Sequence, residues 1–174
     1  MILTEVLRLR HKAKNIKQNI YIDFSYLIIL AASFGAVIVL GAVVAPVIFN
    51  PNKLLVDVTL DHYNSGILMG EIFHRFSYFI YFLAGFVVLY EASMYKMGKR
   101  DSIIMASSVT VVFSSLMFSN VYSPKILAMQ AMGVEATQST TFANIHTASE
   151  LDFKILAVAL AVLFVRRLML LRTT

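Results

Sequence analysis

The chain contains no cysteine, so disulfide bonds, thiolate nucleophiles and cysteine-based metal sites are excluded. Charged residues are also scarce, at 14% of the 174 positions, and histidine occurs only four times. The sequence has no phosphate-binding loop, nucleophile elbow or zinc-protease motif, so no catalytic pattern points to an enzyme. At this length we expect one small domain without a separate soluble module.

Long apolar runs dominate what is present. Hydrophobic residues make up 59% of the chain, and its mean hydropathy is +0.75. Apolar runs cover residues 24–49, 76–95, 102–122 and, less cleanly, 151–171. A helix needs about 20 apolar residues to cross a hydrocarbon layer of about 30 Å, and in lipid its backbone groups must satisfy one another. The sequence therefore predicts an all-α, integral membrane four-helix bundle, with spans at about 24–49, 73–95, 102–123 and 146–171.

Positive charge alternates from gap to gap. Eleven of the 15 Lys and Arg residues lie before the first run, between the second and third runs, or in the C-terminal segment that begins at Arg166. The other four lie between the first and second runs or from the end of the third run to the first turn of the fourth, and they are Lys53, Arg75, Lys125 and Lys154. Cytoplasmic segments carry the excess of Lys and Arg, so both chain ends are predicted to be cytoplasmic and the membrane to be the inner membrane. The net charge of +5 is explained by anionic lipid beside these segments, which makes the bilayer the expected partner rather than nucleic acid.

The N-terminal segment has its own pattern. Apolar side chains in residues 1–22 recur every three or four positions on a basic background. This is typical of an amphipathic helix lying on the membrane surface, and a partner-binding arm or a frayed end is the alternative. We therefore expect an N-terminal interfacial helix at 1–22 and a transmembrane domain over 23–174.

The two outer gaps also show helical periodicity. They predict short amphipathic outer helices over 54–62 and 126–135. Each is followed by a polar break, at 64–66 and at 138–141, before the next span begins.

The two halves of the chain resemble each other. Pro46 and Pro124 lie near the predicted outer ends of the first and third spans, with similar neighbours at an interval of 78 positions. Glu71 recurs as Glu150 at an interval of 79. The pattern indicates a parallel repeat about an axis normal to the membrane, and a chance match is the alternative.

Polar residues gather where the second and fourth spans begin. The second span opens with Glu71, His74 and Arg75, and the fourth with His146, Ser149, Glu150, Asp152 and Lys154. In each set an acid precedes a base by four positions, the favourable order for an ion pair on a helix. Two interpretations are open: solvated helix ends at the membrane interface, or a polar pocket between helices that marks an ion, proton or substrate site.

The same residues are the weak candidates for a metal or cofactor. His74, His146 and Glu150 carry ligand types that suit a divalent metal such as Zn²⁺ or Mn²⁺, but no short ligand spacing accompanies them. Two histidines can also ligate one b-type haem in a helical bundle. No cofactor is favoured on this basis.

Other side chains near the span ends are assigned to the membrane interface. Glu91 is expected to reach Lys96 or Lys99. The tyrosines expected in aromatic belts are Tyr78, Tyr81, Tyr90, Tyr95 and Tyr122.

Four short motifs carry a family resemblance. They are Gly41-Ala-Val-Val-Ala-Pro-Val-Ile-Phe49, Gly70-Glu-Ile-Phe73, Ser119-Asn-Val-Tyr-Ser-Pro124 and Ile145-His-Thr-Ala-Ser149. In this order they resemble the domain of unknown function 4149 family, which is similar to the transmembrane-protein-205-like membrane proteins. The resemblance implies a small four-helix membrane protein without an established enzyme activity. It carries over Pro46, His146 and Ser149, but not His74, where the family often has proline, and this weakens a paired-histidine haem site.

These observations favour a non-enzymatic role. The chain is expected to be an accessory or assembly protein of the inner membrane, or part of a small transport or tolerance system. The rival hypothesis is a haem- or metal-binding redox protein that uses His146 with His74. A small-solute carrier of this length would need a homodimer to enclose a path, and a membrane-protein partner is the other assembly expected.

Overall fold

A computed structural model describes residues 20–51 and 60–172, and every regular element in these ranges is helical. The elements are α2 (Ile20–Val39), η1 (Leu40–Val44), α3 (Ala45–Phe49), α4 (His62–Lys96), α5 (Ser102–Met117), η3 (Phe118–Tyr122), α6 (Ser123–Ala131), α7 (Val134–Thr137) and α8 (Thr140–Arg172). The all-α prediction is confirmed. The surface helix predicted over 1–22 and the outer helix predicted over 54–62 lie almost entirely outside the described residues.

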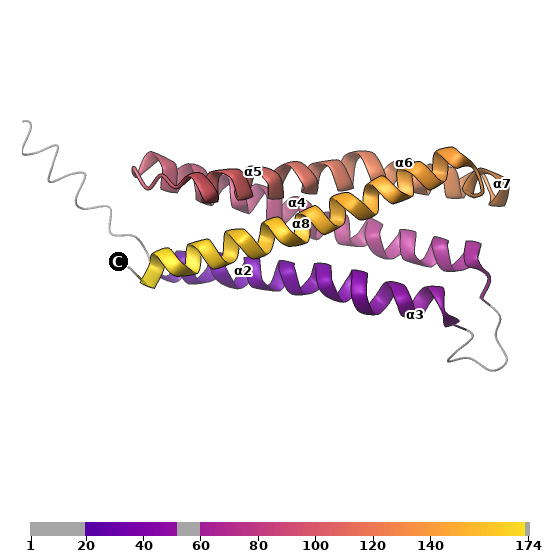
Figure 1. Ribbon diagram of the computed structural model, residues 1–174, viewed down its shortest axis with the longest axis horizontal. Helices are drawn as coiled ribbons and strands as arrows, with labels where there is room; N and C mark the ends of the chain where they lie inside the picture. The colour runs from indigo at the N-terminus through magenta and orange to yellow at the C-terminus, as the bar shows by residue number, and fades with distance from the viewer. Residues whose placement is uncertain (1–19, 52–59, 173–174) are drawn as a thin grey trace, which may run out of the picture.

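Long helices lie side by side and alternate in direction (Figure 1). α8 packs against α5 and α2, and α5 also packs against α4. Three continuous helical segments, Ile20–Phe49, His62–Lys96 and Ser102–Ala131, are long and apolar enough to cross a membrane. They indicate a membrane protein.

The two ends of the assembly differ. One end holds the α4–α5 turn and the end of α8, and we call it the basic end because Lys96, Lys99, Arg100, Arg166 and Arg167 belong to these segments. The other holds α3, α6 and α7, and we call it the proline end because α3 and α6 each begin with a proline in the first turn.

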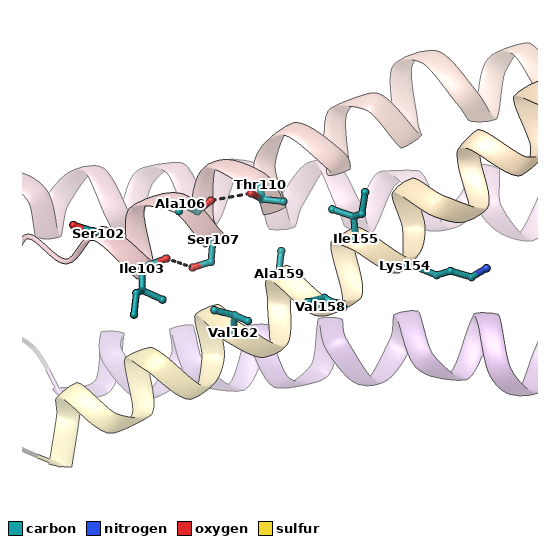
Figure 2. Close-up of a pocket in the computed structure, with 10 residues that line it drawn as sticks. All are labelled: Ser102, Ile103, Ala106, Ser107, Thr110, Lys154, Ile155, Val158, Ala159 and Val162. Carbon is teal, nitrogen blue, oxygen red and sulfur yellow. Dashed lines mark hydrogen bonds between the residues drawn. The ribbon is translucent and has the colours of Figure 1, made fainter.

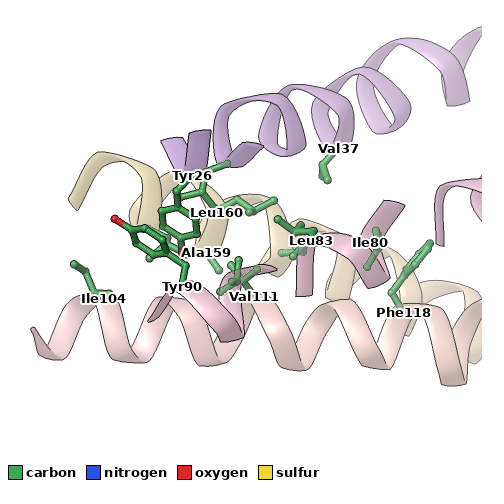
Figure 3. Packing of buried hydrophobic residues seen from close by; sticks show 14 of the residues in the cluster. Tyr26, Val37, Ile80, Leu83, Tyr90, Ile104, Val111, Phe118, Ala159 and Leu160 are labelled. Atoms are coloured by element: carbon green, nitrogen blue, oxygen red, sulfur yellow. The ribbon is translucent and has the colours of Figure 1, made fainter. Parts of the chain in front are cut away.

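Apolar side chains fill the interior and also cover much of the outside. Leu83, Val111 and Leu160 are fully buried in a core to which α2, α4, α5 and α8 all contribute (Figure 3). Leu89 on α4 and Phe113 on α5 are well exposed. A helix in water turns a polar face outward, so apolar side chains on both faces are the arrangement expected in lipid.

A π-helical turn precedes each of the two prolines. η1 leads into Pro46 and η3 leads into Pro124. Proline has no N–H, and its ring clashes with the carbonyl four residues earlier, so a regular α-helix kinks or ends there. The wider turn lets the helix continue. The prediction that the third span ends at Pro124 is therefore wrong, since the segment runs on to Ala131.

The elements recur along the chain at the interval seen between the two prolines. η1 and η3 begin at Leu40 and Phe118, and α4 and α8 begin at His62 and Thr140. Both pairs of starting points are separated by 78 positions. The recurrence therefore involves backbone conformation as well as residue type.

Three other predicted boundaries are corrected. No break occurs at 64–66, because Asp61 caps α4 by accepting a hydrogen bond from the Asn64 N–H at 2.7 Å, and the polar residues form the first turn. The outer helix predicted over 126–135 is divided at Gly133, whose φ of 101° ends α6 and separates it from α7. The polar break at 138–141 is shorter than expected, since α8 already begins at Thr140.

Candidate functional site

The polar residues predicted at the openings of the second and fourth spans form pairs within their own helices. Glu71 accepts a hydrogen bond from Arg75 at 2.7 Å on α4. On α8, Glu150 lies 3.2 Å from His146 and 3.7 Å from Lys154. These side chains are 44% to 78% exposed. Within the described ranges, no recorded interaction joins the α4 set to the α8 set.

The two histidines proposed as haem or metal ligands contact aromatic rings. The His74 ring packs edge-on against Tyr78, and the His146 ring stacks on Phe142 at 5.8 Å between centroids. Ser149 is buried, and its hydroxyl donates to the His146 carbonyl oxygen. No group of three or more metal-ligating side chains occurs in the part of the chain that the structure describes. The geometry gives the haem or metal hypothesis no support.

A largely buried ion pair lies toward the basic end. Arg167 on α8 is only 7% exposed and holds the Glu91 carboxylate through two nitrogens, with Nε–Oε1 at 3.0 Å and Nη2 bonded to Oε2. The Tyr26 hydroxyl donates to the same carboxylate at 2.7 Å. Glu91 therefore has hydrogen-bond donors from two other helices, α2 and α8.

A second buried carboxylate adjoins this pair. Asp23, only 3% exposed, accepts a hydrogen bond from the Tyr90 hydroxyl at 2.7 Å. The Tyr26 and Tyr90 rings stack with centroids 3.7 Å apart (Figure 3), and the Arg167 guanidinium lies 5.2 Å from the Tyr90 ring. We call Asp23, Tyr26, Tyr90, Glu91 and Arg167 the Arg167 cluster.

Local sequence positions explain how the cluster forms. Asp23 and Tyr26 are three residues apart and therefore share one face of α2. Tyr90 and Glu91 are adjacent on α4, so their side chains leave the helix in different directions and reach different partners. The network connects three helices that are far apart in the sequence.

A partly buried ion pair lies beside the cluster. Arg166 donates to Asp101 through Nη2 at 2.7 Å and through Nε at 3.1 Å. Asp101 also caps α5 by accepting from the N–H groups of Ile103 and Ile104, both at 3.0 Å. The hydrogen bond from Arg166, and then those from the α5 backbone, hold the pKa of Asp101 below its ordinary value.

Two hollows accompany these groups. A cavity of about 340 Å³ at the basic end is bordered by every member of the Arg167 cluster except Glu91, and by Lys99, Arg100 and Asp101. A larger, shallow hollow of about 610 Å³ lies between α5 and α8 and is lined mainly by small and apolar residues such as Ala106 and Ala159, with Lys154 toward one end (Figure 2). Only the first has buried charged groups in its wall.

The chain matches one family model, Domain of unknown function (DUF4149), over residues 28–135. The chain belongs to the DUF4149 family. The resemblance predicted from the motifs is confirmed, and the matched region contains both π-helical turns. No curated protein and no solved structure matches the chain.

Arg167 of this DUF4149 protein lies beyond the matched residues, and sequence reasoning missed its role. From the sequence alone, Arg167 is one of the charges that set the topology and reach the interface at the end of the fourth span, and Glu91 is predicted to reach Lys96 or Lys99. That expectation is wrong, because Glu91 binds Arg167 and Tyr26. Tyr90 was assigned to an aromatic belt, yet its ring is buried. The available signal was the acid within the apolar part of α4, since such residues pair inside a bundle.

Proposed function

We propose that this DUF4149 protein is a four-span protein of the inner membrane, with both ends cytoplasmic, and that it is a small, non-enzymatic transport component. The Arg167 cluster, beside a cavity at the basic end, carries the proposal. Ionisable groups inside membrane bundles are costly, usually pair with one another, and mark ion, proton or substrate pathways. An accessory protein that only holds a partner has less need of such a cavity.

The fourth span in this proposal is α8. Its 33 residues extend about 50 Å, and it packs against α2 and α5. Residues 155–165 are uncharged between Lys154 and Arg166, and long basic side chains at such positions can reach the interface. An even number of spans also agrees with Figure 1, in which α8 ends beside the start of α2.

The topology can be tested directly because the chain has no cysteine of its own. Single cysteines are introduced as Lys99→Cys, Glu135→Cys and Thr174→Cys, and intact cells are treated with a membrane-impermeant maleimide. We expect label from outside only at Glu135→Cys, and label at the other two after permeabilisation. Labelling of Thr174→Cys from outside would contradict the four-span arrangement.

The transport role is tested with the purified chain in vesicles of phosphatidylethanolamine and phosphatidylglycerol. We expect it to dissipate an imposed proton or potassium gradient faster than protein-free vesicles do. The double variant Glu91→Gln with Arg167→Gln keeps a polar side chain at both positions but removes both charges, and it should lose the flux. Arg75→Gln, on the exposed pair of α4, is the matched control and should keep it. Absence of flux, with a partner co-purifying in fixed ratio, would favour the accessory role instead.

A homodimer is the assembly that we propose for this role, because four helices leave little room for a path inside one copy. Light scattering in mild detergent measures the mass of the protein. A strictly monomeric protein that nevertheless conducts would contradict the dimer.

A further inference from the structure

Asp152 on α8 is a buried acid that the Arg167 cluster does not include. Its side chain is 8% exposed, and its Oδ2 atom has no hydrogen-bond partner among the described residues. A hydrogen bond connects its carboxyl group to the side chain of Ser114 on α5. Sequence analysis grouped this position with the outer helix opening, whereas the structure buries it between helices.

Both helices place Asp152 away from the two ends of the bundle. Ser114 lies 13 residues after Asp101, which is about 20 Å along the helix, and 11 residues before Lys125, which is about 16 Å. On α8, Asp152 lies 14 residues before Arg166, or about 21 Å, and Arg166 is itself bonded to Asp101. The distance from the Asp101–Arg166 ion pair is therefore about the same along α5 and along α8. In a bundle in which α5 and α8 both cross the membrane, this places the Asp152 carboxyl group within the hydrocarbon layer.

Ser114 belongs to a row of buried hydroxyl groups that follows the third helical segment. Its members are Ser107, Ser108, Ser114, Ser115, Ser119 and Ser123. The Oγ atoms of Ser115 and Ser119 have no partner among the described residues. The row begins about 9 Å from Asp101 and ends beside Lys125, so it extends over most of the segment.

We infer that Asp152 is a membrane-embedded proton-binding site, at which a carboxylate takes up and releases one proton without any change in other bonds. The inference deepens the proposed transport role and rests on it. An ionised carboxylate without a charged partner is very costly in an apolar interior, and a bound proton removes that cost. Ser114 offers a single hydroxyl, whereas a metal cation needs about six oxygen ligands.

No other titratable group of the described residues has a recorded interaction that would neutralise an ionised Asp152 carboxylate in place of a proton. On α2, η3, α6 and α7, which pack against α8, the titratable groups are Tyr21, Asp23, Tyr26, Tyr122, Lys125 and Glu135. α4 also contacts α8, since its Phe73 and Phe76 rings pack against Phe153 beside Asp152. The titratable groups of α4 are His62, Tyr63, Glu71, His74, Arg75, Tyr78, Tyr81, Tyr90, Glu91, Tyr95 and Lys96. α5 contains none between Ser102 and Met117. On α8 itself, Glu150 and Lys154 are exposed and pair with each other. Of all these described groups, none forms a recorded interaction with the Asp152 carboxyl.

The site is tested by reaction with dicyclohexylcarbodiimide, which enters membranes and modifies protonated carboxyl groups in apolar surroundings. We expect mass spectrometry of the purified protein to find the adduct on Asp152 at mildly acidic pH, and less of it as the pH rises. Asp152→Asn should lose that adduct while keeping the elution volume and helical circular dichroism of the wild type. Absence of the adduct on folded wild-type protein would overturn the inference, and so would protection by sodium at constant pH.

A second variant separates proton binding from a merely structural role. Ser114→Ala removes the hydroxyl that donates to the carboxylate, so the midpoint of the labelling profile should move to higher pH. Ser107→Ala is the matched control, because the Ser107 hydroxyl donates to carbonyl groups of its own helix, and its midpoint should not move. Equal midpoints in all three proteins would contradict the assignment.

Flux measurements distinguish the failure of this inference from the failure of the proposed function. Labelling of Asp152 without any proton flux in the vesicles would leave the site and remove the transport role. Proton flux that is the same in wild type and Asp152→Asn would leave the transport role and remove the site.

Discussion

Arg167 on α8 binds Glu91 on α4 through two hydrogen bonds, although 76 positions separate the two residues in the chain. Both side chains are largely buried, and Tyr26 adds a donor from a third helix. A buried pair of this kind adds little net stability compared with a well-packed apolar pair, but removing one partner leaves the other charge uncompensated. The pair therefore makes the position of α8 depend on α4.

Truncation of one partner should be strongly destabilising. We expect Arg167→Ala to lower the free energy of unfolding by about 3–5 kcal/mol, because Glu91 then stays buried without its cation. Unfolding by sodium dodecyl sulfate in mixed micelles measures the change. Arg75→Ala serves as the control, since its pair with Glu71 is exposed and should contribute at most about 1 kcal/mol. Similar losses in the two variants would contradict this account.

Removal of both charges should be milder than removal of one. In the double variant Glu91→Leu with Arg167→Leu, no unpaired charge is left in the interior, so most of the stability lost in Arg167→Ala should return. The same micelle titration tests this. The variant should still fail in the flux assay, which would separate folding from function. Stability no better than that of Arg167→Ala would show that the hydrogen bonds, rather than the buried charge, dominate.

Acid should weaken the ion pair between Asp101, at the α4–α5 turn, and Arg166 on α8. The pKa of Asp101 is lowered in the folded protein, first because Arg166 donates a hydrogen bond to its carboxylate. A group with a lowered pKa contributes its full stability above its unfolded pKa of about 4 and loses that contribution as the pH falls through the lowered folded value. We expect Asp101→Asn to lack this component while keeping a capping side chain. Identical pH profiles of thermal unfolding below about pH 4 in the wild type and in Asp101→Asn would contradict a stabilising role of the ionised Asp101 carboxylate.

Two glycines in helices should respond in opposite ways to alanine. At Gly70 on α4 an added Cβ would lie 2.5 Å from Gln130 Oε1 and 3.2 Å from a Leu127 methyl group, so Gly70→Ala should destabilise by about 1–3 kcal/mol. Gly35 has nothing within 4 Å, and Gly35→Ala should be neutral or stabilise by up to about 1 kcal/mol. The unfolding midpoints of Gly70→Ala and Gly35→Ala, each compared with that of the wild type, measure the two changes in stability. Equal changes would show that α4 and α6 are not closely packed at Gly70.

The membrane helices were predictable from sequence, and most of their contacts were not. A run of about 20 apolar residues has few conformations other than a helix in lipid, so hydropathy predicted the three long apolar helices that the structure contains. The partner of Glu91 could not be found in this way, because local spacing shows only neighbours on the same helix. Asp152 was assigned to a helix opening for the same reason, since its burial depends on α5.

Predictions of helix boundaries were wrong where the backbone adjusts locally. Asn64 and Gly66 are typical of loops, yet Asp61 caps the helix one residue before it starts and includes them in its first turn. Proline at position 124 predicted a helix end, and the π-helical turn before it allows the segment to continue. These outcomes depend on hydrogen bonds that residue type alone does not specify.

The recurrence of elements at an interval of 78 positions divides the chain into two helical hairpins joined by residues 97–101. The ion pair between Arg167 and Glu91 crosses from one hairpin to the other, as does the contact of α8 with α2. Cleavage of the chain within residues 97–101 would therefore leave two fragments that associate with each other in the bilayer. The stability of their complex would depend on the number of fragments per unit area of membrane. A single hairpin would reach the same architecture only by pairing with a second one.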